Sequence, residues 1–223
     1  MFGLGRRKTD TVLDGLAPVV DGTVDRDGHL RGTTGGRHVD VWFERLDPTP
    51  LTTALDSANP VYVDVIRFRL AATGATPWYL RSERQLRPGG GHAYEFVRQP
   101  AAAALRRFSP FPDLVPTEDP AVEARLRQAG LFEAISRLAP ASSLWLPRVR
   151  FTPDPRAAMR ERMRGVPVPA DVAAGPRDSG AEVGLMIDTP RPNLAGPATE
   201  RFAAMLTAAI GIAELNERVN PAA

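Results

Sequence analysis

Three histidines are the side chains of this sequence best suited to acid–base or metal chemistry. His38 and Asp40 lie two residues apart in an alternating stretch, so they share one face of a strand and could supply two metal ligands. His29 would provide a third ligand if the glycines at 32–36 turn the chain back on itself. Because a two-residue spacing arises freely by chance, a solvated strand face is the simpler interpretation, and we expect no bound metal.

The sequence lacks the motifs that mark common catalytic and nucleotide-binding sites. It contains no G-x-S-x-G around a serine and no G-x-x-x-x-G-K-[ST] loop. The glycine clusters at 32–36 and 89–91 lead into or join predicted strands, which is typical of turns rather than of phosphate-binding loops. No cysteine is present, which excludes disulfides, thiolate nucleophiles and iron–sulfur clusters. We therefore expect no cofactor and no catalytic residue, although a carboxylate pair of the kind that cleaves glycosidic bonds stays open.

Arginine supplies nearly all of the positive charge, since of 28 basic residues only Lys8 is lysine. The excess extends along the whole chain, which favours the codon bias of a GC-rich bacterial genome over selection for anion-binding guanidinium groups. At 148–164 it is densest, and Arg156, Arg160 and Arg164 would form a basic stripe on a short helix. A solvated helix face is the simpler interpretation of this stripe. Nucleic-acid binding is not expected, because the net charge is only +2.

The candidate side chains His38, Asp40 and His92 lie in a stretch of alternating apolar and polar residues between Arg37 and Arg98. Strict alternation places one face of a strand in the core and the other in water. The pattern predicts four strands, at 37–46, 61–70, 77–84 and 93–98, and their connections favour an antiparallel meander. Three more strands are predicted at 29–32, 143–152 and 181–188. Pro147 favours an edge position or a bulge for the strand that contains it.

Two main helices are predicted to cover this sheet. The first runs over 119–138, with Pro120 in its first turn and Gly130 weakening it midway. The second runs over 198–219 and has more apolar residues than one stripe needs, which favours burial in the core or, alternatively, in a homodimer interface. The expected fold is therefore α+β: an antiparallel, curved sheet of five to seven strands covered by two main helices, the longer one C-terminal.

A groove between this sheet and the long helix is the expected place for a ligand. The candidates to line it are His38, Asp40, His92, Trp78, Tyr94 and Trp145. In the alternative interpretation, the aromatic residues among them simply belong to the core.

One domain is expected over 10–223, preceded by a flexible basic tail at 1–9. The prolines, alanines and glycines of 165–180 predict a mobile loop. The longest apolar stretch, 203–213, is too short to cross a bilayer, and no secretory signal pattern follows Met1, so a cytoplasmic location is expected. The basic tail would make at most a weak contact with an anionic membrane.

These observations favour a non-catalytic cytoplasmic protein-interaction or scaffold domain. Its partner would be another protein or a second copy of the chain, bound through the 198–219 helix. One alternative is a small-ligand-binding protein or hydrolase-type enzyme that uses the groove. A second alternative is peripheral contact with an anionic membrane or nucleic acid through the arginine stripe.

Overall fold

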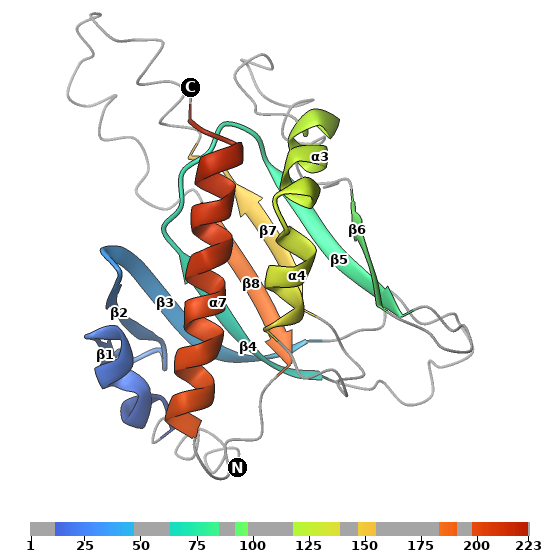
Figure 1. The fold of residues 1–223 in the computed structure, drawn as a ribbon. Helices are drawn as coiled ribbons and strands as arrows, with labels where there is room; N and C mark the ends of the chain where they lie inside the picture. Colours follow the sequence, from blue (N-terminus) through green and yellow to red (C-terminus); the bar gives the residue numbers. More distant parts are fainter. Residues whose placement is uncertain are drawn as a thin grey trace, which may run out of the picture.

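The computed structural model describes residues 12–46, 63–84, 92–97, 118–138, 147–154, 183–190 and 198–222. Within them the chain is an α+β protein with one curved, unclosed antiparallel sheet (Figure 1). The strands are β1 (Thr23–Val24), β2 (Leu30–Thr34), β3 (Arg37–Leu46), β4 (Val63–Leu70), β5 (Trp78–Arg84), β6 (His92–Phe96), β7 (Arg148–Thr152) and β8 (Gly184–Pro190). The helices are η1 (Ala17–Val20), which continues a helical turn at 12–16, α3 (Pro120–Gln128), α4 (Leu131–Ser136) and α7 (Ala198–Val219).

The predicted fold class is confirmed, with one strand more than the five to seven expected. All seven predicted strands are present, some with shifted ends, and the eighth is the two-residue β1 beside β2. Of the two alternatives for Pro147, the edge position is wrong, because β7 lies inside the sheet between β8 and β5. A proline immediately before a strand removes no hydrogen bond from the ladder, so an interior position is tolerated.

The predicted meander over 37–98 is wrong in one respect, since β4 and β5 are not neighbours. The strand order is β1-β2-β3-β4-β8-β7-β5-β6, so that β8 and β7 lie between them. The pairings of β3 with β4 and of β5 with β6 are as expected. Crossing from β4 to β5 takes three strand spacings, about 14 Å. The connection at 71–77 spans this distance easily at about 3.3 Å per residue.

Polar contacts with the end of α7 hold this connection in place. The buried Asn216 side chain accepts a hydrogen bond from Trp78 Nε1 at 2.7 Å and donates one to the carbonyl of Thr73 at 2.8 Å. Asn220 accepts from the Thr76 N–H at 3.0 Å and donates to the Thr76 carbonyl at 2.8 Å. Because both asparagines are buried, each unmade bond would be costly.

The sheet face under the helices is the core of the protein. One row of side chains that crosses five strands in register, from β3 to β5, is fully buried: Val41, Phe68, Ile187, Val149 and Leu80. Phe202 of α7 stacks on the phenylalanine of this row, with ring centroids 5.8 Å apart. In Figure 1, α7, α4 and α3 lie side by side in front of the sheet.

The C-terminal helix contributes most of its apolar residues to this core. The buried ones are Phe202, Met205, Leu206, Ala209, Ile212, Ala213 and Leu215. Its outward positions are small or charged: Ala204, Thr207, Gly211, Glu214 and Arg218. The excess of apolar residues in the sequence of this helix is therefore explained by burial within the chain itself.

The helix predicted over 119–138 is two shorter helices. The side chain of Asp119 caps α3 by accepting a hydrogen bond from the Ala121 N–H at 2.8 Å. Gly130 then adopts a left-handed conformation with φ of 88°, which no regular helix can contain, and α4 begins after it. The break lets Leu126 and Leu131 both turn into the core.

Candidate functional site on the polar face of the sheet

The sheet face opposite the core is mostly polar, with Val65 and Met186 as buried apolar residues, and we call it the polar face. Its described charged and aromatic side chains come from neighbouring strands between β2 and β6. They are Arg31, His38, Asp40, Trp42, Glu44, Arg67, Arg69, Tyr79, Arg81, Glu95, Arg148, Arg150 and Asp188. No described helix packs against this face, which makes it the candidate functional site.

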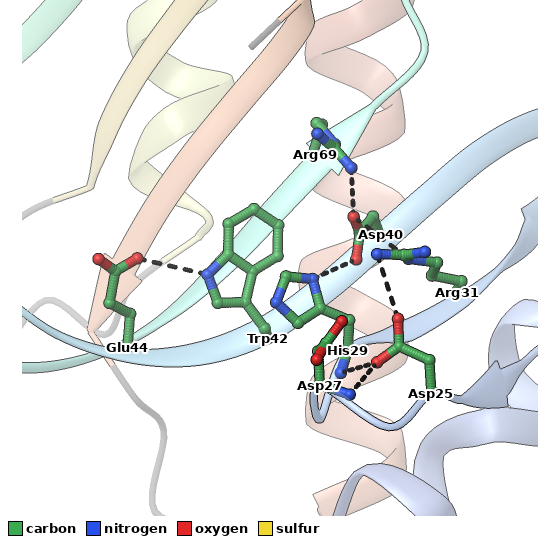
Figure 2. A network of polar contacts seen from close by, with 8 residues as sticks. All are labelled: Asp25, Asp27, His29, Arg31, Asp40, Trp42, Glu44 and Arg69. Carbon is green, nitrogen blue, oxygen red and sulfur yellow. Dashed lines mark hydrogen bonds and ion pairs between the residues drawn. The ribbon is translucent and has the colours of Figure 1, made fainter. Parts of the chain in front are cut away.

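Asp40 of β3 is the centre of a charged network at one side of the polar face (Figure 2). Its Oδ1 lies 3.1 Å from His29 Nδ1, and its Oδ2 accepts a hydrogen bond from Arg69 of β4. The Nε of Arg31 lies 3.7 Å from the same Oδ2. The Asp40 side chain is only 8% exposed, so its charge is balanced by these neighbours rather than by water.

Two tight turns bring these side chains together. In the first, Asp25 Oδ1 accepts hydrogen bonds from the backbone N–H groups of His29 at 3.0 Å and Asp27 at 2.9 Å. The bond from His29 lowers the pKa of Asp25. In the second, Gly35 and Gly36 have φ values of 55° and 73°, which suit a two-residue hairpin turn. The resulting register places the arginine of β2 directly opposite the buried aspartate of β3.

Trp42 forms an aromatic surface within the same network. The imidazole of His29 stacks on its indole, with ring centroids 4.6 Å apart and an interplanar angle of 10°. The guanidinium groups of Arg67 and Arg69 lie 5.6 and 6.0 Å from the indole centroid. The indole Nε1 donates a hydrogen bond to Glu44 Oε2 at 3.3 Å, as Figure 2 shows. Cation–π contacts of this kind add to the ion pairs that hold the arginines.

Arg67 of β4 joins two carboxylates at the centre of the polar face. Its Nε and Nη2 donate to Asp188 of β8, and its Nη1 donates to Glu44 Oε2 at 2.6 Å. The Arg67 and Asp188 side chains are 12% and 13% exposed. Burial alone would lower the pKa of Arg67, but the hydrogen bonds with Asp188 and the negative charges of Asp188 and Glu44 together raise it. This bidentate pair fixes both side chains.

Two arginines of β7 also lie on the polar face. Arg148 lies opposite Asp188 of β8, and Arg150 lies opposite Tyr79 of β5, the neighbouring strand at the other edge of β7. Burial lowers the pKa of Arg150, and the charge of Arg67 adds to this effect, although Asp188 acts in the opposite direction. The positive charge of Arg150 is therefore held partly away from water, where a negative group interacts with it more strongly.

Arginines outnumber carboxylates on the polar face. Among the strand side chains that the structure describes there, six are arginines: Arg31, Arg67, Arg69, Arg81, Arg148 and Arg150. Four are carboxylates: Asp40, Glu44, Glu95 and Asp188. The two signs alternate across much of the sheet, so the face carries a mixed charge pattern with a small positive excess.

Among the described side chains, His29, His38 and Asp40 are not grouped into the metal site that their spacing allowed. The approach of His29 to Asp40 is observed, but His38 is exposed and lies opposite Thr33 of β2. Within the described ranges, no three His, Cys, Asp or Glu side chains are grouped to hold a metal ion. The hydrogen bond between Asp40 and His29 is of the kind that orients a catalytic imidazole. Because Asp40 also binds arginines, the arrangement is better suited to holding charged groups in place.

The residues expected to line one groove lie on both faces of the sheet. His38 and Asp40 are on the polar face. Trp78 is fully buried on the core face, and Tyr94 is half-buried there, with its ring centroid 5.5 Å from that of Phe132 in α4. Burial raises the pKa of Tyr94. Because the sheet separates Asp40 from Trp78, these candidates do not line a single groove.

The remaining sequence-based candidates fall outside what the structure describes. The His92 side chain is not described, although its backbone begins β6. Outside the described residues lie Trp145, Arg156, Arg160 and Arg164, the predicted tail at 1–9 and the predicted loop at 165–180.

The arginines of the central strands were not among the residues predicted to form a site. Arg67 and Arg69, like Arg148 and Arg150, are two residues apart, a spacing that places both members of each pair on one face of a strand. That signal was present in the sequence. Asp188 could not be assigned to Arg67, because the two are far apart in the chain and meet only when β8 pairs with β4.

The fold and the site together define an α+β protein with an arginine-rich polar sheet face. Comparison of the chain with protein-family models, with curated proteins and with solved structures finds no match. None of the described helices is both long enough and apolar enough to span a bilayer.

Proposed function

We propose that the protein is a non-catalytic interaction domain and that a protein partner docks on the polar face of its sheet. The observation that carries this proposal is the array of arginines and carboxylates on adjacent strands, held in place by ion pairs. We also propose that the interaction takes place in the cytoplasm, which the lack of cysteine supports.

The fixed geometry of the array supports a role in binding. Arg67 is held by Asp188 and Glu44, and Asp40 is held by His29 and Arg69. Side chains that are already ordered lose little conformational freedom when a partner binds, so more of the interaction energy appears as affinity. Arginine is also enriched at protein interfaces, where its planar group combines hydrogen bonding with stacking.

The helix side of the molecule offers less to a partner. α7 buries its large apolar side chains in the core of its own chain. Among the described residues, Val183 is the one exposed large apolar side chain, and it lies beside β8 rather than on α7. A homodimer interface through the 198–219 helix is accordingly the weaker proposal, since obligate interfaces are usually apolar.

A pair of double variants tests the proposal. Arg148→Gln/Arg150→Gln removes two charges from the polar face, and Arg137→Gln/Arg218→Gln removes two exposed charges from the helix side as the matched control. Each purified protein is immobilised and incubated with an extract of the source cells, and captured proteins are quantified by mass spectrometry. We expect one protein that the unmodified chain and the control capture equally and that the polar-face variant loses.

The captured protein is then purified, and its Kd is measured by calorimetry with all three forms. We expect the polar-face variant to raise the Kd by about tenfold or more, as for the loss of a hydrogen bond to a charged group. Unchanged binding by a polar-face variant that keeps its circular dichroism spectrum would contradict the proposal, as would equal losses in both variants.

A further inference from the structure

We infer that the partner presents an extended acidic segment and that Arg148 and Arg150 bind its carboxylates. This inference rests on the proposed function and adds to it the chemistry of the partner. The bound segment is a peptide with glutamate or aspartate at alternate positions.

The spacing of the β7 arginines supports this kind of partner. Val149 between them is fully buried in the core, so Arg148 and Arg150 extend from the same side of the strand. Alternate residues of a strand are about 6.6 Å apart. An extended peptide repeats its side chains on one side at the same distance. Carboxylates at every second position of the peptide therefore match the two guanidinium groups.

The electrostatics of the central strands favour an anion at this position. Burial lowers the pKa of Arg150, and the neighbouring charge of Arg67 adds to this effect. A carboxylate that approaches Arg150 would add a charge-assisted hydrogen bond to the contacts that this group already makes within the protein. The planar guanidinium group is suited to this role, because it can bind both oxygens of one carboxylate.

The interleaved carboxylates favour a peptide over a nucleic acid. Asp40, Glu44 and Asp188 lie in the same array as the arginines, and Glu95 lies at its far side. The continuous phosphate chain of a nucleic acid would meet these negative charges along with the arginines. Separate carboxylates on a peptide can contact the arginines and avoid the acidic positions, so charge complementarity selects the peptide.

Fluorescence anisotropy with defined probes tests the inference. The main probe is a short fluorescein-labelled peptide in which glutamate alternates with threonine. The same peptide with glutamine for glutamate is the neutral probe, and oligothymidylate represents a phosphate chain. We expect the acidic peptide to bind the unmodified protein, Arg148→Gln/Arg150→Gln to raise its Kd by about tenfold or more, and Arg137→Gln/Arg218→Gln to change it by less than about twofold.

A salt titration of the unmodified protein gives a second readout that needs no variant, and we expect affinity for the acidic peptide to fall as salt rises. Salt-independent binding, equal binding of the neutral peptide, or tighter binding of oligothymidylate would each overturn the inference. Failure of the acidic peptide while the polar-face variant still loses its captured protein would overturn the inference alone and leave the proposed function standing.

Discussion

At the scale of single residues, the polar face depends most on Asp40. This buried carboxylate contacts groups from both neighbouring strands and from the turn before β2. It anchors the imidazole that stacks on Trp42, and it neutralises an arginine of β4. Loss of its charge would remove the hydrogen bonds that this buried carboxylate makes with His29 and Arg69, and hydrogen bonds to a charged group contribute more to stability than neutral ones.

We predict that Asp40→Ala lowers the free energy of unfolding by about 2 kcal/mol. The matched control is Asp64→Ala, which breaks an exposed ion pair with Arg45 and should cost less than about 1 kcal/mol. Urea denaturation measures both values. Equal losses in the two variants would show that burial does not strengthen the Asp40 network.

A second residue-scale feature links the sheet to the end of α7. Arg37 Nη1 and Nη2 donate to the two oxygens of Glu217, at 2.7 and 2.6 Å. These hydrogen bonds hold the pKa of Glu217 below its ordinary value, although burial opposes them. A carboxyl group whose pKa is lower in the folded state stabilises the fold above its unfolded pKa, and this stabilisation is lost as pH falls through the folded pKa.

We therefore predict a pH-dependent effect of Glu217→Gln. The variant should lower the melting temperature at neutral pH, where Glu217 is charged in both states. The difference from the unmodified protein should shrink as the pH falls below about 4, where the carboxyl group becomes protonated. Differential scanning calorimetry across this range measures the difference. A constant difference at all pH values would contradict the assignment.

At the scale of elements, two glycines have different roles in the helices. Gly130 separates α3 from α4 and has φ of 88°, a left-handed conformation that a residue with a Cβ adopts only at a cost. Gly211 lies within α7 and is exposed, with open space where a Cβ would be. The same residue type is therefore required at one position and only tolerated at the other.

This contrast predicts opposite effects of one substitution. Gly130→Ala should destabilise the protein by about 1 kcal/mol, because alanine is strained at positive φ. Gly211→Ala should stabilise it by about 0.5–1 kcal/mol, because alanine favours a helix interior. Urea denaturation of the two variants gives the signs directly. Stabilisation by Gly130→Ala would mean that α3 and α4 join into one helix.

At the scale of the whole molecule, the crossing from β4 to β5 determines which strands are neighbours. It leaves room for β7 and β8 between the two halves of the predicted meander. The asparagines at the end of α7 hold the crossing chain by hydrogen bonds to its backbone. The central arginines of the polar face come from β4 and β7, so the arrangement of the site depends on this crossing.

Asn216→Ala tests the importance of the crossing for the whole fold. It removes the partner of the buried Trp78 Nε1 and of the Thr73 carbonyl, and we predict a loss of about 3 kcal/mol in the free energy of unfolding. Thr207→Ala, at an exposed position of the same helix, should change it by less than about 0.5 kcal/mol. Similar values for both would show that the crossing contributes little to stability.

Much of the fold was predictable because its signals are local. Alternation of apolar and polar residues located the strands, and it correctly assigned Phe68 and Arg67 to opposite faces. Asp40 of the candidate site could be predicted in the same way, since it lies in that pattern. The predicted groove was wrong, because the strands that carry Trp78 and Asp40 present these residues to opposite faces of the sheet.

The sequence by itself determined the secondary-structure elements, the α+β class and the residues that share one face of β3 and of β4. Only the tertiary structure decided the strand order, and with it the pairing of Arg67 with Asp188 and the position of Arg150 beside them. The physical reason is that periodicity along a strand depends on near neighbours in the chain. The choice of the adjacent strand depends on contacts between distant segments, which compete only when the chain is compact.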